Sequence, residues 1–301
     1  MHFREESAAA DFVGMDEVRR GGIGIFRRAM AHDQQCAVGF RREGHARNLR
    51  AESEERRVKI SDFRFLVSQL LPSVWVVPVM GKMLLWIDPT PRSGPEAMAV
   101  DEWLLENATL PVLRTYRWLG DWVSIGYFGT LAEARAHFPE VEIVRRWTGG
   151  GTVDHRCDWT YTLVVPRSES LANLRGGESY GQIHNALAET LRVEGIGVRA
   201  SEETEETGVR LCFENPVQHD LVAANDRKIA GAGQRRTRHG LLHQGSVAAP
   251  CNGDIDFQKR SENFASRLAA GWENFAPLID MEDIQGRVAN RYAGSEWTDR
   301  R

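Results

Sequence analysis

The stretch from Arg145 to His155, which reads RRWTGGGTVDH, is the most informative part of the sequence. Its two arginines end a run typical of a short strand, and three successive glycines follow. Glycine lets the backbone approach a ligand closely and present N–H groups to an anion, while arginine keeps its charge at any physiological pH. The stretch therefore predicts a strand that leads into a cradle for phosphate or carboxylate.

Two further segments decide how this loop is interpreted, because three glycines alone are more often a flexible turn. Residues 212–236 contain Cys212, then Asp220, then Lys228 on an expected strand followed by small residues. A lysine beside such a tight backbone can reach a phosphoryl or carboxyl oxygen as a point charge. Without the rest of the pattern, an exposed strand lysine would be the better interpretation. Residues 242–246 add polar groups on a further strand, where a lone histidine is more often structural than catalytic.

The chain from Met83 onward alternates strands with helices. A helix is expected to begin at Pro95, and its apolar stripe contains Asp101, which needs a partner and is best explained as an ion-pair or capping acid. Turns at Gly120-Asp121 and Asn225-Asp226 predict two hairpins, and residues 142–147 are expected to pair with 159–165. The expected elements are strands at 83–87, 112–118, 122–127, 142–147, 159–165, 220–224, 227–232 and 241–248, and a second helix at 179–194. Hairpins dominate, which argues for an α+β domain with a mixed, mostly antiparallel sheet and packed helices.

The three segments together resemble lipoate-protein ligase A and its relatives, the octanoyltransferases and biotin ligases. The superfamily pattern is Arg-Arg-x-Ser/Thr-Gly-Gly-Gly-x-Val, then an Asp and a lysine strand rich in Gly and Ala, then His-x-Gly-Ser/Thr. It appears here at residues 145–153, 220–234 and 243–246. The resemblance covers residues 83–250 and implies the biotin/lipoate ligase-like catalytic fold.

The resemblance also implies roles for individual residues. It places Lys228 where the family's lysine touches the acyl carboxylate and the α-phosphate, and Cys212 where one branch of octanoyltransferases carries its nucleophile. A buried, inert cysteine is an equally good interpretation of Cys212. The residues implied in cofactor binding are Arg146, Gly149, Gly150, Gly151, Thr152, Val153, Asp154, His155 and Asp220. No metal-ligating residue is assigned.

The function that this resemblance favours is that of a lipoate-protein ligase. Such an enzyme activates lipoate with ATP and Mg²⁺ to lipoyl-AMP, and the lipoyl group then passes to a lysine of an acceptor domain. The alternative is a cysteine-dependent transferase that takes octanoate from octanoyl-acyl carrier protein without ATP. A biotin ligase fits less well, and a non-enzymatic lipoyl-binding protein becomes attractive only if Lys228 and the glycine loop do not converge in space.

The expected partners follow from either enzyme. They are lipoyl domains of 2-oxoacid dehydrogenase complexes and the glycine cleavage H protein, with an accessory subunit or an acyl carrier protein as further candidates. A net charge of -4 gives no reason to expect nucleic acid. The longest uncharged stretch, 66–81, is too short for a bilayer span, so neither membrane association nor a secretory signal is expected. Four scattered cysteines predict free thiols in a reducing cytoplasm.

Residues 1–79 differ in character from the rest of the chain. Arginine and glutamate interleave in residues 1–60 without a helical or strand period, which is typical of disorder or loose helix. Two explanations stay open, a spurious extension upstream of an initiator at Met80 or Met83 and a genuine regulatory extension. The first is favoured because interpretable structure begins there. The catalytic domain is therefore expected to span residues 80–301.

Overall fold

We describe the fold from a computed structural model, for residues 78–202, 217–248 and 255–300. These residues belong to one compact unit, Ser73–Arg301. Its main sheet has eight strands in the order β11-β1-β2-β6-β10-β9-β8-β7. The strands are β1 (Met80–Ile87), β2 (Val112–Tyr116), β6 (Asp158–Pro166), β7 (Arg199–Ala200), β8 (Leu221–Val222), β9 (Lys228–Arg236), β10 (Gly240–Ala248) and β11 (Ala269–Asn274).

The sheet is mixed and mostly antiparallel, which confirms the predicted fold class. Its two parallel pairs are β1–β2 and β1–β11. The remaining pairs, from β2–β6 through β8–β7, are antiparallel. A second sheet has three strands in the order β4-β3-β5, which are β4 (Glu142–Arg145), β3 (Trp122–Ile125) and β5 (Val153–Asp154).

Two of the predicted strand pairs are wrong. The turn at Gly120 forms, with φ of 82°, but it carries the chain from β2 in the main sheet to β3 in the small one. β2 is buried at all five residues, as a central strand with neighbours on both sides must be. Likewise β4 pairs with β3 and not with β6. The turn at Asn225-Asp226 does join β8 to β9, and Asp226 has a φ of 61°.

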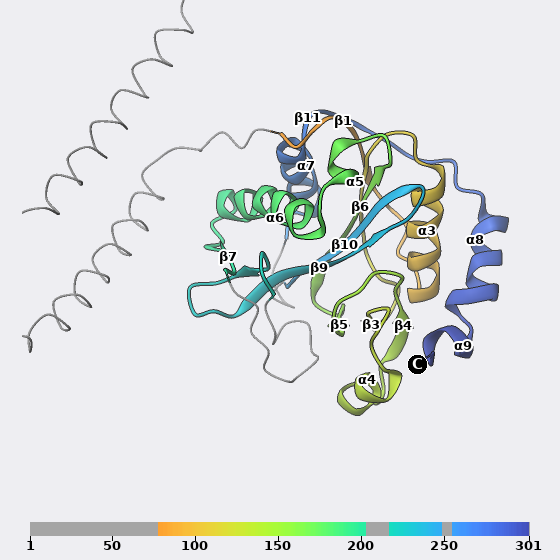
Figure 1. Cartoon of the computed structure of the whole chain (residues 1–301). Coiled ribbons are helices and arrows are strands. Elements are labelled where there is room, and N and C mark those ends of the chain that lie inside the picture. The colour runs from red at the N-terminus through yellow and green to blue at the C-terminus, as the bar shows by residue number, and fades with distance from the viewer. Residues whose placement is uncertain (1–77, 203–216, 249–254, 301) are drawn as a thin grey trace, which may run out of the picture. The chain divides into compact units, whose positions relative to one another are not determined.

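Helices cover both faces of the main sheet (Figure 1). One face carries α6 (Gly176–Val193), α7 (Phe257–Leu268) and the short α5 (Ser170–Asn173); Trp159, Tyr161 and Leu163 of β6 pack in that core cluster. The other face carries α3 (Gly94–Asn107), against which Val164 packs. The C-terminal segment adds α8 (Met281–Arg287), the π-helical turn η1 (Val288–Tyr292) and α9 (Ser295–Thr298) beside α3, and α4 (Leu131–His137) packs on the small sheet.

α3 begins at Gly94, one residue before the predicted start at Pro95, and the predicted need of Asp101 for a partner is confirmed. Ser93 caps the helix and Glu96 accepts hydrogen bonds from both its backbone N–H and its hydroxyl. Arg114 on β2, fully buried, donates to Asp101 Oδ1 at 2.7 Å and to Asp88 Oδ2 at 2.8 Å. Asp101 Oδ2 accepts from Gln244 of β10 at 2.7 Å. This ionic cluster therefore ties α3 to the centre of the sheet.

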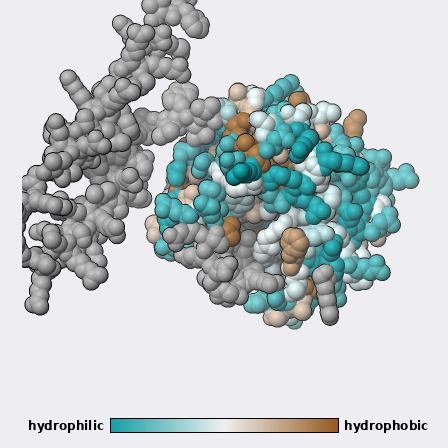
Figure 2. Space-filling model, in the orientation of Figure 1, coloured by the Kyte–Doolittle hydropathy of each residue, from teal (hydrophilic) through white to brown (hydrophobic). Residues whose placement is uncertain are grey.

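The surface of the described unit is mainly hydrophilic on the face shown in Figure 2, with small apolar areas between the polar residues. Among the described residues, the most exposed large apolar side chains are Leu278, Phe128 and Val193. No helix in the described ranges is long and apolar enough to cross a membrane. Cys157 is disulfide-bonded, which corrects the expectation that all four thiols are free. Cysteine spacing alone does not reveal which thiols meet in the folded chain.

Candidate active site

The glycine loop joins β4 to β5 and lies directly on two other glycines. A Cβ at Gly126 would fall 1.9 Å from the carbonyl oxygen of Gly150, and one at Gly233 would fall 2.4 Å from that of Gly149. Gly150 itself has a φ of 96°, which side-chain-bearing residues rarely adopt. Sequence reasoning missed Gly126 and Gly233. Their only signal was a glycine inside or beside a strand-like run, which can mark a close backbone approach.

Arg146 holds the loop in place from within. Its guanidinium, in a side chain only 5% exposed, donates to the carbonyl oxygens of Gly149 at 2.9 Å and Gly151 at 2.7 Å, and to Ser124 Oγ at 3.0 Å. The N–H groups of Gly149 and Gly150 donate to no other residue in the described ranges. The loop therefore turns its carbonyls toward arginine, and anion binding by its N–H groups stays a prediction.

Arg145 has a different role from its neighbour. It is fully buried and donates to backbone carbonyls on both sides, among them Gly129 at 2.7 Å and Thr298 at 2.8 Å. These bonds fasten the C-terminal segment against the loop that follows β3. The charge of Arg145 is thus used in the architecture, and only one of the two arginines lines the site.

The loop's fit on Gly126 leads to a first prediction. Gly126→Ala should displace the loop, because its Cβ would overlap the Gly150 carbonyl oxygen, and overpacking of this kind costs about 1–3 kcal/mol. Urea unfolding should show that loss, and turnover should fall with it. Gly286→Ala is the matched control, since no atom lies within 4 Å of its Cβ position and alanine favours helix. Unchanged stability of Gly126→Ala would contradict the described fit.

Lys228 lies at the start of β9 and is buried, with 4% of its surface exposed. Its Nζ is 2.7 Å from Asp220 Oδ2, and a Cβ at Gly231 would fall 2.6 Å from the same Nζ. The pairing of β8 with β9 has an irregular register at Leu221/Val222. The Lys228 amine lies over the backbone of Gly231. Gly231 lies on the same strand as Gly233, which contacts the loop. Lys228 and the glycine loop therefore converge, which removes the condition for the non-enzymatic interpretation.

Asp220 is held from three directions. Besides Lys228, it accepts hydrogen bonds from the backbone N–H of Val217 at 2.7 Å and from the hydroxyl of Tyr180 on α6. Burial, with the charge of Asp220 adding to it, raises the pKa of Tyr180 well above 10, so its hydroxyl stays protonated and donates. Asp220 was predicted to bind a cofactor, which stays a prediction; in the structure its carboxylate forms an ion pair with Lys228.

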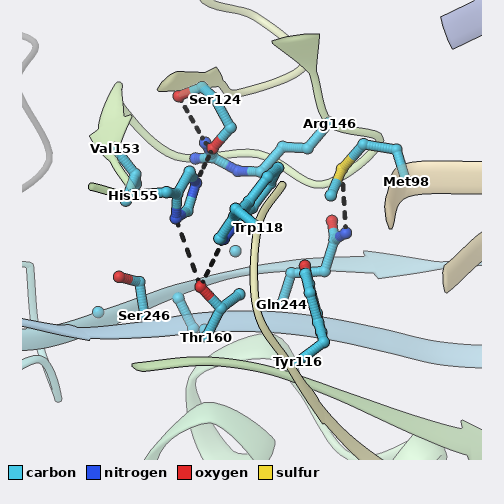
Figure 3. Close-up of a pocket in the computed structure, with 14 residues that line it drawn as sticks. Met98, Tyr116, Trp118, Ser124, Arg146, Val153, His155, Thr160, Gln244 and Ser246 are labelled. Atoms are coloured by element: carbon cyan, nitrogen blue, oxygen red, sulfur yellow. Dashed lines mark hydrogen bonds between the residues drawn. The ribbon is translucent and has the colours of Figure 1, made fainter. Parts of the chain in front are cut away.

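A pocket opens on the α3 side of the sheet, between the glycine loop and strands β9 and β10 (Figure 3). Apolar walls come from Met98, Tyr116, Trp118 and Val153, and the floor is polar. Of the predicted site residues, Arg146, Val153 and His155 line it. The complete lining is Met98, Tyr116, Trp118, Ser124, Arg146, Val153, His155, Thr160, Gly231, Ala232, Gly233, Gln244, Gly245 and Ser246.

Other predicted residues do not line this pocket. The carboxylate of Asp154 forms an ion pair with Arg156, 2.6 Å away. Partial burial raises the pKa of Asp154, but the hydrogen bonds from Arg156 outweigh this effect and lower it. Thr152 is absent from the lining as well. Cys212 lies outside the described residues. Among the described residues, no group of three or more His, Cys, Asp or Glu side chains is arranged to hold a metal ion.

His243 and His184 lie on the opposite, α6 side of the sheet. His243 contacts Tyr161 OH at 3.1 Å and Gln234 Nε2 at 3.0 Å, which is the bonding of a structural histidine. Burial holds the pKa of His243 well below 6.5 and lowers that of His184 to about 4, against the nearby charge of Asp220. His184 donates from Nδ1 to the His219 carbonyl at 2.8 Å. Both rings are therefore neutral at pH 7.

This burial predicts acid sensitivity. Because the folded pKa of His184 lies below its unfolded value of about 6.5, the unfolded chain binds the proton first, and stability that is complete above pH 6.5 falls toward pH 4. The loss from this one group amounts to about 3 kcal/mol at most. His184→Asn should flatten the pH dependence of urea unfolding in that window. The same change at exposed His137 should leave it unchanged; equal slopes for all three proteins would refute the assignment.

A model of the lipoyl protein ligase A/B catalytic domain matches residues 93–270. The chain belongs to this family. It is therefore an enzyme of the lipoyl and octanoyl transferase class, as the motifs predict.

Curated relatives carry the name octanoyltransferase LipM. The chain is 34% identical to that of Carboxydothermus hydrogenoformans over 58% of this chain and 67% of the relative. For Moorella thermoacetica the identity is 33%, over 63% and 74%; for Bacillus subtilis it is 28%, over 64% and 75%. The matches thus cover two thirds to three quarters of these relatives.

Solved structures of lipoate-protein ligases share the fold. Lipoate-protein ligase A bound with ATP superimposes with a TM-score of 0.55 at 20% identity, over 73% of this chain and 98% of the other. A Thermoplasma acidophilum protein described as a putative lipoate protein ligase, with bound lipoic acid, gives 0.54 at 19% identity, over 73% and 98%. At this identity the likeness establishes the fold and not the reaction.

The expectation of an ATP-dependent lipoate-protein ligase is wrong. The curated relatives, at 26–34% identity, are octanoyltransferases. The glycine loop and Lys228 fit both branches of the family, so they could not separate the two activities. Cys212 was the residue that could, and its sequence context left two interpretations open.

Proposed function

We propose that this chain is an octanoyltransferase that moves an octanoyl group from a carrier-protein thioester to a lysine of a lipoyl domain. The observation that carries the proposal is its similarity to curated octanoyltransferases, together with a buried Lys228 that lies against Gly231, on the strand whose Gly233 contacts the glycine loop. Neither ATP nor Mg²⁺ takes part in this reaction, because the acyl group arrives already activated as a thioester.

The first half-reaction uses Cys212 as nucleophile. Its sulfur attacks the thioester carbonyl carbon, a new C–S bond forms, and the carrier thiol leaves with a proton. Negative charge develops on the carbonyl oxygen during this step. We assign its stabilisation to the ammonium of Lys228, which is buried and fixed by Asp220 at 2.7 Å and needs no reorganisation. The apolar wall of the pocket, with Met98, Trp118 and Val153, receives the acyl chain.

The second half-reaction transfers the chain to the acceptor. The lysine amine attacks the Cys212 thioester, the C–N bond forms as the C–S bond breaks, and the amine proton passes to the departing thiolate. The same charge appears on the same carbonyl oxygen, so Lys228 serves both steps. Lipoyl domains of 2-oxoacid dehydrogenase complexes and the glycine cleavage H protein are the proposed acceptors, and acyl carrier protein is the proposed donor.

An assay with two donor mixtures tests the proposal. The purified full chain is incubated with an apo-lipoyl domain and either octanoyl-acyl carrier protein without ATP, or ATP, Mg²⁺ and free octanoate or lipoate. We expect the acceptor to gain an octanoyl group from the carrier without ATP. No transfer from the carrier, with ATP-dependent use of the free acid, would overturn the proposal.

Residues 80–301 are proposed as the catalytic unit. β1 begins at Met80, and the backbone N–H of Val79 donates to the Leu268 carbonyl at 3.0 Å, so the chain is tied to the catalytic unit from residue 79. A chain that begins at residue 78 should keep both cooperative unfolding and octanoyl transfer. Loss of cooperative unfolding in that chain would show that the preceding residues contribute to the fold.

A further inference from the structure

Three residues around the pocket form a hydrogen-bonded line that the transfer reaction above does not use. Ser124 Oγ on β3 is 2.7 Å from His155 Nε2, and His155 Nδ1 is 2.7 Å from Asp158 Oδ2 at the start of β6. All three are buried: Ser124 is 1% exposed, His155 9%, and the Asp158 side chain 1%. Ser124 and His155 line the pocket wall, beside Arg146 (Figure 3).

The surrounding hydrogen bonds fix where the protons are. Arg146 can only donate, and its Nη1 lies 3.0 Å from Ser124 Oγ, so the serine accepts there and its own proton points to His155 Nε2. His155 must then carry its proton on Nδ1, which donates to the Asp158 carboxylate. This is the arrangement in which an imidazole accepts a serine proton while a carboxylate orients it and stabilises the resulting cation.

The carboxylate and the ring are themselves held in place. The hydroxyls of Thr160 and Ser246 donate to Asp158 Oδ2 at 2.9 Å and 2.5 Å, which fixes the position of this carboxylate. Trp118 stacks on the His155 ring, with 4.1 Å between the ring centroids. The Trp118 Nε1–H donates to Thr160 Oγ1 at 2.8 Å. The hydrogen-bonded line of Ser124, His155 and Asp158 is therefore held in place by neighbouring side chains, which include Thr160 on β6 and Ser246 on β10, and does not depend on a bound substrate.

We propose that Ser124, His155 and Asp158 form a second acyl-accepting centre, which gives the enzyme a serine-dependent hydrolase activity toward medium-chain acyl esters and thioesters. Ser124 Oγ attacks the carbonyl carbon, the C–O bond forms, its proton passes to His155, and the thiol or alcohol leaves with that proton. Water then attacks the serine ester, giving the free acid and restoring Ser124 and His155. Arg146 donates to Ser124 Oγ at 3.0 Å and so holds the serine in place, while its other N–H groups stay on backbone carbonyls.

A nucleophile-directed probe tests this centre in the full chain. Cys212→Ala is used as the background, so that thiol acylation does not contribute, and the protein is treated with an alkyl fluorophosphonate and separately with p-nitrophenyl octanoate. We expect a phosphonyl adduct on Ser124 by peptide mass spectrometry, and p-nitrophenol release that falls by on the order of 10²-fold or more in Ser124→Ala. Asp158→Asn should slow labelling of Ser124 while the serine remains present.

The control is Ser266→Ala, which removes an exposed serine on α7 and should change neither readout. Peptide mapping of the Cys212→Ala protein decides the question even if Ser124→Ala does not fold, because Ser124 is intact there. An unlabelled Ser124 in that protein, or ester hydrolysis that survives Ser124→Ala, overturns the inference. This inference does not depend on the proposed octanoyl transfer. A failure of that proposal would be seen in a different experiment, in which the unmutated chain transfers no octanoyl group without ATP.

Discussion

Lys228→Met is expected to lower the rate of octanoyl transfer by on the order of 10²-fold or more, because it removes a preorganised charge from the site where the oxyanion forms. Methionine keeps the length and the apolar part of the side chain. The rate should be measured with saturating octanoyl-carrier and apo-lipoyl domain, without ATP. Near-normal turnover would remove Lys228 from the reaction.

The same substitution leaves Asp220 buried without its cation, and breaking a buried ion pair costs about 3–5 kcal/mol. A low rate could then arise from a damaged fold. Lys228→Met combined with Asp220→Asn separates the two effects, since a neutral amide no longer needs the cation. We expect the double variant to regain much of the lost stability and to remain inactive. Recovery of activity together with stability would show that Lys228 acts through the fold.

Cys212→Ser is expected to abolish octanoyl transfer, with a loss of about 10³-fold or more, as when other catalytic nucleophiles are removed. A serine hydroxyl is a far poorer nucleophile than a thiolate at neutral pH unless a base activates it. The assay is the ATP-free transfer to an apo-lipoyl domain. Turnover within a few-fold of normal would mean that the cysteine contributes only packing.

Cys36→Ser is the matched control for that experiment, because Cys36 precedes the region that matches the family. It should transfer octanoate at the normal rate. A comparable loss in both variants would point to a general effect of thiol removal and would take the special role away from Cys212.

Local signals in the sequence were sufficient for several elements of the fold. Ser93, Pro95 and Glu96 fix the start of α3 by chemistry within four residues, and the turn at Asn225-Asp226 needs only the backbone freedom of its own residues. The glycine loop was also predicted, because its glycines and Arg146 are adjacent in sequence. These features could be predicted because the residues that form them are close together in the sequence.

Strand order required information that no local pattern contains. β2 is buried along its whole length and β3 along most of it, so their sequences fit any neighbouring strand and a turn between them did not establish that they pair. β11 was not predicted either; its parallel pairing with β1 joins residues nearly the full length of the domain apart. The role of Arg145 was hidden for the same reason, since its partners at Trp297 and Thr298 lie more than 150 positions away.

The site residues likewise fall into those that local sequence predicted and those that only the fold revealed. Lys228 and Asp220 are eight positions apart and were singled out from the sequence, although the part Asp220 plays was not. Ser124 and Asp158 were overlooked, because Ser124 reaches His155 across 31 positions through the pairing of β3 with β5. A serine in a short strand has no distinguishing pattern until the fold supplies its partner.

The acyl-enzyme itself is the most direct test of the proposed transferase. The unmutated full chain is mixed with octanoyl-acyl carrier protein, with ATP, Mg²⁺ and acceptor all omitted, and its intact mass and peptides are measured. The account predicts one octanoyl adduct that maps to Cys212, is released by hydroxylamine, and disappears when apo-lipoyl domain is added. No acyl adduct on Cys212 under these conditions, with the acceptor still octanoylated, would contradict it.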